Sequence, residues 1–169
     1  MADISHPQIT IDLINEAATV ALAGQVSAIA IPGDTVALFG TLGSGKTVFA
    51  RAFINARCEI SEDVPSPTFT LVQTYEFPAP DGPVPVYHFD LYRIEDLAEI
   101  EELGMEDALI DGIALIEWPE RLEGRLPANR LEVALGQGDG TDQRSAELNG
   151  HGSWGPRIDT LAEKVVGND

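Results

Sequence analysis

The chain has 169 residues, of which 44% are hydrophobic, and we expect one domain over residues 1–169 with a single sizeable core. Its 28 acidic residues against 10 basic ones give a net charge of −18, which argues against a surface that binds nucleic acid phosphates directly. The single cysteine, Cys58, excludes an internal disulfide. No stretch is apolar enough to span a bilayer, so we expect a cytoplasmic protein without membrane contact.

The first third of the chain predicts a strand, a helix, a strand and a helix. Residues 9–13 alternate like a strand, and Asn15 can cap a helix over 16–29. Residues 35–39 are short, apolar and β-prone, whereas apolar side chains recur at helical spacing over 46–57.

A glycine-rich segment lies between that second strand and second helix. Residues 40–47 read Gly-Thr-Leu-Gly-Ser-Gly-Lys-Thr and fit the phosphate-loop pattern G-x-x-x-x-G-K-[ST]. In this pattern, backbone N–H groups and a helix N-terminus face the phosphates, the lysine reaches the β and γ phosphates, and the hydroxyl ligates Mg²⁺. The segment therefore predicts that a nucleoside triphosphate binds to Thr41, Leu42, Gly43, Ser44, Gly45, Lys46 and Thr47, with Thr47 on the metal.

The remaining elements complete an α/β pattern. In chain order the sequence predicts a hairpin of 68–77 and 84–93, helices at 94–103 and 105–110, a buried strand at 113–116, a hairpin of 130–135 and 144–148, and a helix at 159–166. This order predicts a P-loop NTPase-like three-layer fold, with a mixed, mainly parallel central sheet, antiparallel hairpin strands and helices on both faces.

Two acids follow apolar strands, where a P-loop protein holds Mg²⁺ or its water. Glu117 closes the strand 113–116, and Asp90 ends the apolar-leaning part of the strand 84–93. A solvated carboxylate at a strand end is the alternative interpretation of Glu117. The catalytic candidates are therefore Lys46, Asp90 and Glu117, and the sequence leaves open which acid is nearer the metal.

Other polar residues are candidates for a switch or for partner contacts. In the strand 86–93, the two-residue period places His88, Asp90 and Tyr92 on one face, either around phosphate or a partner or as the outer face of a hairpin. Arg93 could bind phosphate or a partner carboxylate. Trp118 could shield a nucleotide or pack at the strand end.

A stiff loop with two hydroxyls precedes the first hairpin. Pro65-Ser66-Pro67-Thr68 places Ser66 and Thr68 ahead of a strand, where P-loop proteins carry a switch that senses the γ-phosphate. Plain turn chemistry is the alternative.

Four motifs occur in one order: the phosphate loop, Ser-Pro-Thr-Phe-Thr-Leu-Val at 66–72, His-Phe-Asp-Leu-Tyr-Arg at 88–93 and Ile-Glu-Trp-Pro-Glu-Arg at 116–121. Together they resemble the TsaE (YjeE) family of small bacterial ATPases, which serve the threonylcarbamoyladenosine modification of tRNA. The resemblance covers about residues 9–135, and neither the turn around Gly138 nor residues 158–169 carry any of it.

The resemblance implies ATP and Mg²⁺ as cofactors and TsaD-like and TsaB-like proteins as partners. It further implies that Lys46 binds phosphate, that Thr47 and Glu117 hold Mg²⁺, and that Asp90 is needed for hydrolysis. No direct tRNA binding is expected, since the chain is strongly acidic.

Two other classes of function remain open at this point. One is a small-molecule P-loop kinase, and the other is a nucleotide-gated binding module with negligible turnover.

Overall fold

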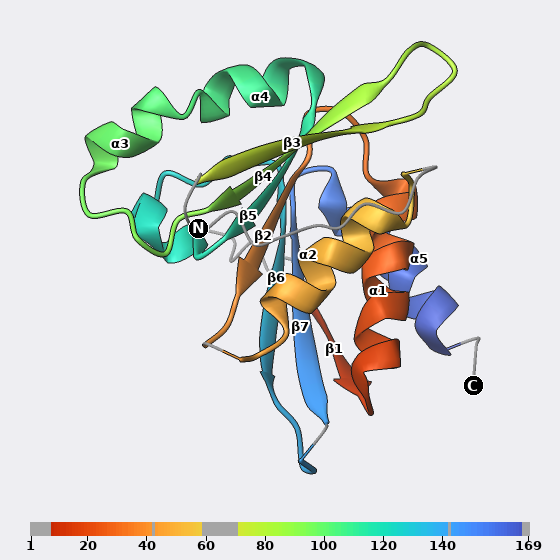
Figure 1. Ribbon diagram of the computed structural model, residues 1–169. Helices are drawn as coiled ribbons and strands as arrows, with labels where there is room; N and C mark the ends of the chain where they lie inside the picture. The colour runs from red at the N-terminus through yellow and green to blue at the C-terminus, as the bar shows by residue number, and fades with distance from the viewer. Residues whose placement is uncertain (1–7, 42, 59–70, 142, 167–169) are drawn as a thin grey trace, which may run out of the picture.

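A mixed sheet forms the centre of the computed structural model, which describes residues 8–41, 43–58, 71–141 and 143–166. Within these residues the sheet has seven strands in the order β1-β7-β6-β2-β5-β4-β3 (Figure 1). The strands are β1 Gln8–Leu13, β2 Thr35–Phe39, β3 Val72–Phe77, β4 Val84–Asp90, β5 Ile113–Glu117, β6 Arg130–Gln137 and β7 Arg144–His151.

The four central strands, β6, β2, β5 and β4, are parallel to one another. Antiparallel strands flank them, with β3 on one edge and β7 followed by β1 on the other. Because parallel neighbours end at the same edge of a sheet, the segments that follow β2, β4 and β5 meet there. The predicted fold class is confirmed, with a mostly parallel centre and antiparallel strands at both sides.

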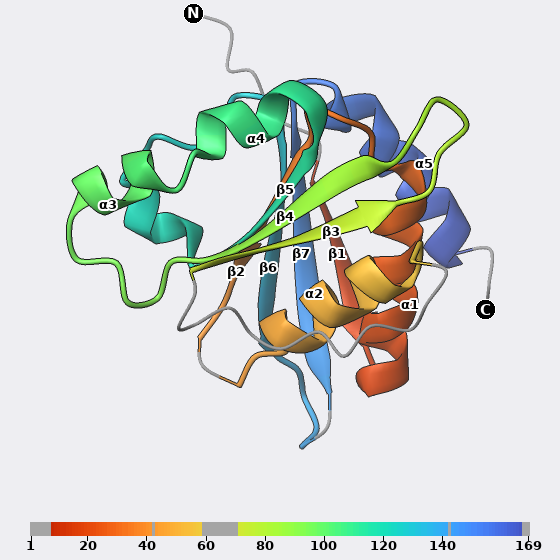
Figure 2. The same ribbon diagram turned by 45° about the horizontal axis from the view of Figure 1, so that its top comes forward.

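Helices cover both faces of this sheet, as Figures 1 and 2 show. One layer contains α1 Glu16–Ile29, α2 Lys46–Asn55 and α5 Trp154–Val166; the other contains α3 Leu97–Glu102, α4 Met105–Asp111 and the 3₁₀ helix η1 Pro119–Leu122. β5 supplies both cores by alternation, since Ile113 and Leu115 join the first layer while Ala114 and Ile116 join the second. A fully apolar strand is therefore what a sheet buried on both faces requires.

Several boundaries differ from the sequence-based predictions for local reasons. α3 begins at Leu97 rather than residue 94, because Asp96 caps it in a capping box with Glu99. β4 ends at Asp90 rather than residue 93, because the Asp90 carboxylate accepts a hydrogen bond from the Tyr92 backbone N–H, 3.0 Å away, and the chain turns.

The other differences lie at strands β3, β6 and β7 and at the C-terminal helix. β3 begins at Val72, and residues 68–70 of the predicted strand lie outside the described part of the chain. β6 and β7 run past the predicted ends at 135 and 148. α5 begins at Trp154, five residues before the predicted start, and buries Trp154 and Ile158 in the core beneath it. Among the described residues, no helix has the length and apolar character needed to cross a membrane.

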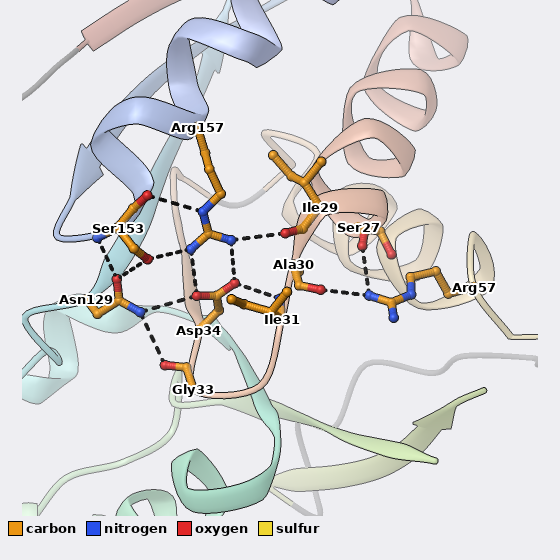
Figure 3. A network of polar contacts seen from close by, with 10 residues as sticks. All are labelled: Ser27, Ile29, Ala30, Ile31, Gly33, Asp34, Arg57, Asn129, Ser153 and Arg157. Atoms are coloured by element: carbon orange, nitrogen blue, oxygen red, sulfur yellow. Dashed lines mark hydrogen bonds and ion pairs between the residues drawn. The ribbon is translucent and has the colours of Figure 1, made fainter. Parts of the chain in front are cut away.

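A buried ion pair joins α5 to the turn between α1 and β2 (Figure 3). The Arg157 guanidinium donates to both carboxylate oxygens of Asp34, at 2.7 and 2.8 Å, and to the Ile29 carbonyl at 3.0 Å. Asp34 is 1% exposed and also accepts from the Ile31 N–H and from Asn129. Such a bidentate pair, with its remaining lone pairs satisfied, can offset the cost of removing the charges from water.

A second arginine links the two helices of the same layer (Figure 3). Arg57, just after α2, donates to the carbonyls of Ser27 and Ala30 at 3.1 and 2.9 Å. The last carbonyls of a helix lack partners within the helix, and α1 has no basic residue in its last turn. Arg57 therefore caps α1 from a neighbouring element.

We predict that Arg157→Met lowers the free energy of unfolding by roughly 3 kcal/mol, because it leaves the Asp34 carboxylate buried without its cation. Urea denaturation of the wild type and the variant measures this loss. Arg125→Met is the matched control, since Arg125 is exposed and lies 3.6 Å from Glu101, so its loss is expected to be below about 1 kcal/mol. Equal losses in the two variants would contradict this account of the pair.

Candidate functional site

The phosphate loop leaves β2 and enters α2, as the sequence predicts. Gly40 has φ 147°, and a Cβ there would meet the Ser44 hydroxyl and lie 2.7 Å from the Leu135 carbonyl oxygen. Gly45, at φ 108°, occupies the cap position before α2. Both positions therefore require glycine, one for space and one for a left-handed backbone. Leu42, which the sequence assigns to the loop, lies outside the described residues.

Lys46 is folded back onto the loop. Its ammonium donates to the carbonyls of Gly40 and Thr41 at 2.6 and 2.8 Å, and it lies 4.1 Å from the centre of the Trp118 ring. Burial lowers the pKa of Lys46, while the nearby carboxylates of Glu117, Glu120 and Asp90 oppose that shift. The cation is thus positioned at the loop, held by weak acceptors that a phosphate could replace.

Glu117 contacts both the phosphate loop and β4. Its Oε1 accepts from the Thr47 hydroxyl at 3.2 Å, and its Oε2 lies 2.7 Å from His88 Nε2. The His88 and Glu117 side chains are 1% and 2% exposed. Because an ionised carboxylate only accepts hydrogen bonds, the imidazole N–H is the donor in this pair. Glu117 is therefore held between two donors and is not the solvated carboxylate that was the alternative interpretation.

Asp90 and Glu117 are neighbours in the sheet. The register pairs Asp90 with Glu117 and His88 with Leu115 across β4 and β5. Asp90 is buried at the end of β4, where it caps the turn through Tyr92. The two acids that the sequence could not rank thus lie side by side, but it is Glu117 whose hydrogen bond to the Thr47 hydroxyl is identified.

Trp118 lies in a left-handed backbone conformation, at φ 61°, directly after Glu117. Its ring packs 4.8 Å from the Tyr92 ring and over the Lys46 ammonium. A left-handed conformation is costly for a bulky residue and is often found at functional sites. Trp118 is therefore aimed at the phosphate loop rather than only packed at the strand end.

A cleft of about 440 Å³ gathers most of the predicted site. Its lining includes Gly43, Gly45, Lys46, Thr47, Asp90, Tyr92, Arg93, Glu117 and Trp118. His88 is fully buried beneath Glu117 rather than on an outer face, since β4 is an interior strand. The hydroxyls of Ser66 and Thr68 lie outside the described residues.

The donor set at the cleft suits a magnesium ion. Mg²⁺ prefers oxygen ligands and usually binds through one or two carboxylates together with substrate phosphates. Thr47 and Glu117 bring a hydroxyl and a carboxylate oxygen to one place at the phosphate loop. In the described part of the chain, no group of three or more His, Cys, Asp or Glu side chains could hold a metal by itself.

The sequence interpretation missed one residue near the loop. Arg144, the first residue of β7, donates to the Gly43 carbonyl at 3.4 Å. Arg144 reaches the loop because of strand pairing: β6 runs parallel to β2, so the turn after β6 lies at the same edge of the sheet as the phosphate loop. That pairing could not be read from the sequence pattern alone.

The fold and the loop together define a P-loop NTPase-like protein. The family model described as "Threonylcarbamoyl adenosine biosynthesis protein TsaE" matches residues 13–146. The chain belongs to the TsaE family.

Individual relatives agree with this assignment. The chain is 36% identical over 157 residues to the tRNA threonylcarbamoyladenosine biosynthesis protein TsaE of Bacillus subtilis, covering 92% of each chain. It is 42% identical over 123 residues to the protein of that name from Rickettsia felis, covering 73% of this chain and 70% of the relative. The crystal structure of Bacillus subtilis YdiB matches with a TM-score of 0.68 and 30% identity over 97% of each chain.

We predict that His88 and Glu117 are energetically coupled. His88→Leu leaves the Glu117 carboxylate with one donor fewer in a buried position, so it should lower the free energy of unfolding by roughly 3 kcal/mol. Adding Glu117→Gln should recover part of this loss, because a neutral amide is less costly to bury. A double-mutant cycle by urea denaturation tests the coupling, and additivity of the two changes within about 0.5 kcal/mol would rule it out.

Proposed function

We propose that this chain binds ATP with Mg²⁺ and hydrolyses it. The observation that carries the proposal is the meeting of the Thr47 hydroxyl and the Glu117 carboxylate, 3.2 Å apart, at a phosphate loop that also holds the Lys46 ammonium. A cation, a hydroxyl and an acid in this arrangement are what phosphoryl transfer to water requires of a P-loop protein.

Each residue has a distinct role in the proposal. Lys46 exchanges the carbonyls of Gly40 and Thr41 for the β and γ phosphates. Thr47 and Glu117 would hold Mg²⁺, directly or through its water, and the bound ion would supply positive charge beside the phosphates. Glu117 is preferred over Asp90 on the metal side because of its contact with Thr47.

Asp90 is proposed to position the attacking water. It is buried beside Glu117 and lines the same cleft as Lys46. Trp118 and Tyr92 cover the Lys46 side of the cleft and could limit entry of other water molecules. Asp90 therefore acts on the nucleophile while Glu117 acts on the metal.

The pathway proposal follows from the family. The curated relatives are named for tRNA threonylcarbamoyladenosine biosynthesis. We propose that this chain serves the same modification through TsaD-like and TsaB-like proteins. Its net charge of −18 favours coupling through protein contacts over direct binding of tRNA. In this proposal, Ser66, Thr68, Tyr92 and Arg93 sense the nucleotide or contact a partner.

We predict slow ATP hydrolysis by the isolated chain and faster hydrolysis when TsaD-like and TsaB-like proteins are added. Phosphate release in Mg²⁺ buffer measures both rates, and Lys46→Ala should abolish both because phosphate loses its cation. Arg125→Ala also removes one cation, but an exposed one, so it is the matched control for charge and should not change either rate.

The same assay distinguishes the proposed ATPase from the two other classes of function, a small-molecule kinase and a nucleotide-gated binding module. Phosphate transfer to a small acceptor, with no release to water, would favour a kinase. Partner binding that depends on nucleotide without turnover under any condition would favour a binding module. Hydrolysis by Lys46→Ala at the wild-type rate would contradict the proposed function.

A further inference from the structure

His88 is buried beneath the candidate metal side of the cleft and donates to a carboxylate there. Its Nε2 lies 2.7 Å from Glu117 Oε2, and the two side chains are 1% and 2% exposed. The other ring nitrogen, Nδ1, is buried and has no hydrogen-bond partner among the residues that the structure describes. A buried polar atom without a partner costs free energy. Within the described part of the chain, the imidazole therefore acts on one group, the Glu117 carboxylate.

The strand register sets the direction from which His88 reaches this carboxylate. His88 pairs with Leu115, and Asp90 with Glu117, across the parallel strands β4 and β5. Because side chains two residues apart in a strand point to the same face, His88 lies on the same face as Glu117, one diagonal step before it. Leu115 belongs to the apolar core of that face, whereas Glu117 lines the cleft. The imidazole thus supports the carboxylate from inside the protein.

The two oxygens of Glu117 have different surroundings. Oε2 accepts from the buried imidazole at 2.7 Å, whereas Oε1 accepts from the Thr47 hydroxyl, on the phosphate loop, at 3.2 Å. The first distance is short for an N–H···O bond, and the second is long for an O–H···O bond. The contact with Thr47 is therefore the one that a ligand at the loop can replace. While His88 engages Oε2, the side chain presents Oε1 alone to the loop.

Divalent cations differ in how they use a carboxylate. Mg²⁺ requires near-octahedral geometry, retains several of its waters and takes few oxygens from the protein. Ca²⁺ accepts more oxygen ligands in a flexible geometry, and it commonly takes both oxygens of one carboxylate. A carboxylate with one oxygen engaged by a buried donor therefore suits Mg²⁺ better than Ca²⁺.

We propose that His88 is a positioning residue that makes the site selective for Mg²⁺ over Ca²⁺, because it holds Glu117 so that a single oxygen faces the phosphate loop. His88 acts through Glu117 and lines no part of the cleft itself. This inference rests on the proposed binding of ATP with Mg²⁺, and it adds the residue that decides which cation serves.

The test measures how much each cation strengthens nucleotide binding. Isothermal titration calorimetry gives the dissociation constant of a non-hydrolysable ATP analogue in EDTA, in Mg²⁺ and in Ca²⁺, and the gain for each cation is the affinity relative to EDTA. His88→Leu removes the donor and should lower the ratio of the Mg²⁺ gain to the Ca²⁺ gain about tenfold. His88→Gln keeps an N–H donor at a similar reach and should keep the ratio within about twofold of the wild type.

Two further variants distinguish positioning from a loss of folding stability. Arg157→Met breaks the buried pair with Asp34, away from the cleft, so it destabilises the fold and should leave the ratio unchanged. Glu117→Gln removes the carboxylate on which His88 acts, so the addition of His88→Leu to it should change the ratio by less than about twofold. Thermal unfolding identifies the variants that are folded at the temperature of the titration.

A fourth variant keeps the test decisive if His88→Leu does not fold. His88→Asn places its amide nitrogen near the position of Nδ1 rather than Nε2, too far from Glu117 to donate. It should therefore lose the selectivity that His88→Gln keeps, and equal ratios in these two variants would overturn the inference.

The other outcomes point to different conclusions. A wild-type ratio in folded His88→Leu would overturn the inference, as would an equal fall of the ratio in His88→Leu and Arg157→Met. A wild type in which Ca²⁺ and Mg²⁺ give the same gain would contradict only the selectivity. A wild type that does not bind the analogue, or gains nothing from Mg²⁺, would contradict the proposed function itself.

Discussion

The parallel pairing of β2, β5 and β4 is the constraint on which the site depends. This register sets Leu38 opposite Glu117 and Glu117 opposite Asp90, so that two acids end beside the strand that leads into the phosphate loop. Because side chains alternate across a sheet, a slip of one residue in β5 would turn Glu117 away from Thr47 and move Ile116 out of its core. The apolar cores on both faces of the sheet therefore fix the register of β5, and with it the orientation of Glu117 toward Thr47. Asp34 and Arg157 strengthen the same layers around the turn that enters β2.

The charged groups of the site are balanced against one another without a nucleotide. Lys46 bonds to loop carbonyls and lies over Trp118, while Glu117 bonds to Thr47 and His88. Buried charges are costly unless they have such partners. In the proposed reaction, the phosphates and Mg²⁺ would replace some of these contacts. Nucleotide binding would therefore exchange one set of hydrogen-bond and charge partners for another.

Much of the site could be predicted from the sequence, because a phosphate loop has a fixed spacing and two acids follow apolar strands. The sequence could not rank Asp90 and Glu117, since the ranking depends on the distance from Glu117 to Thr47 across two strands. It placed His88 on a polar face but not beneath Glu117, because nothing local indicates that β4 lies inside the sheet. Arg144 was missed for a related reason: its contact with Gly43 joins residues that are distant in the chain. The observed start of a helix differs from the predicted one where a capping residue or a buried tryptophan sets it, as at Asp96 and Trp154.

The central claim is that Glu117 belongs to the metal side of a nucleotide site. Its most direct test is the affinity for ATP with and without Mg²⁺, measured by calorimetry for the wild type, Glu117→Gln and the control Asp159→Asn. The account predicts that Mg²⁺ strengthens ATP binding in the wild type and the control, and that Glu117→Gln loses most of this gain while its affinity without Mg²⁺ stays within about twofold. An undiminished Mg²⁺ gain in a folded Glu117→Gln variant would contradict it.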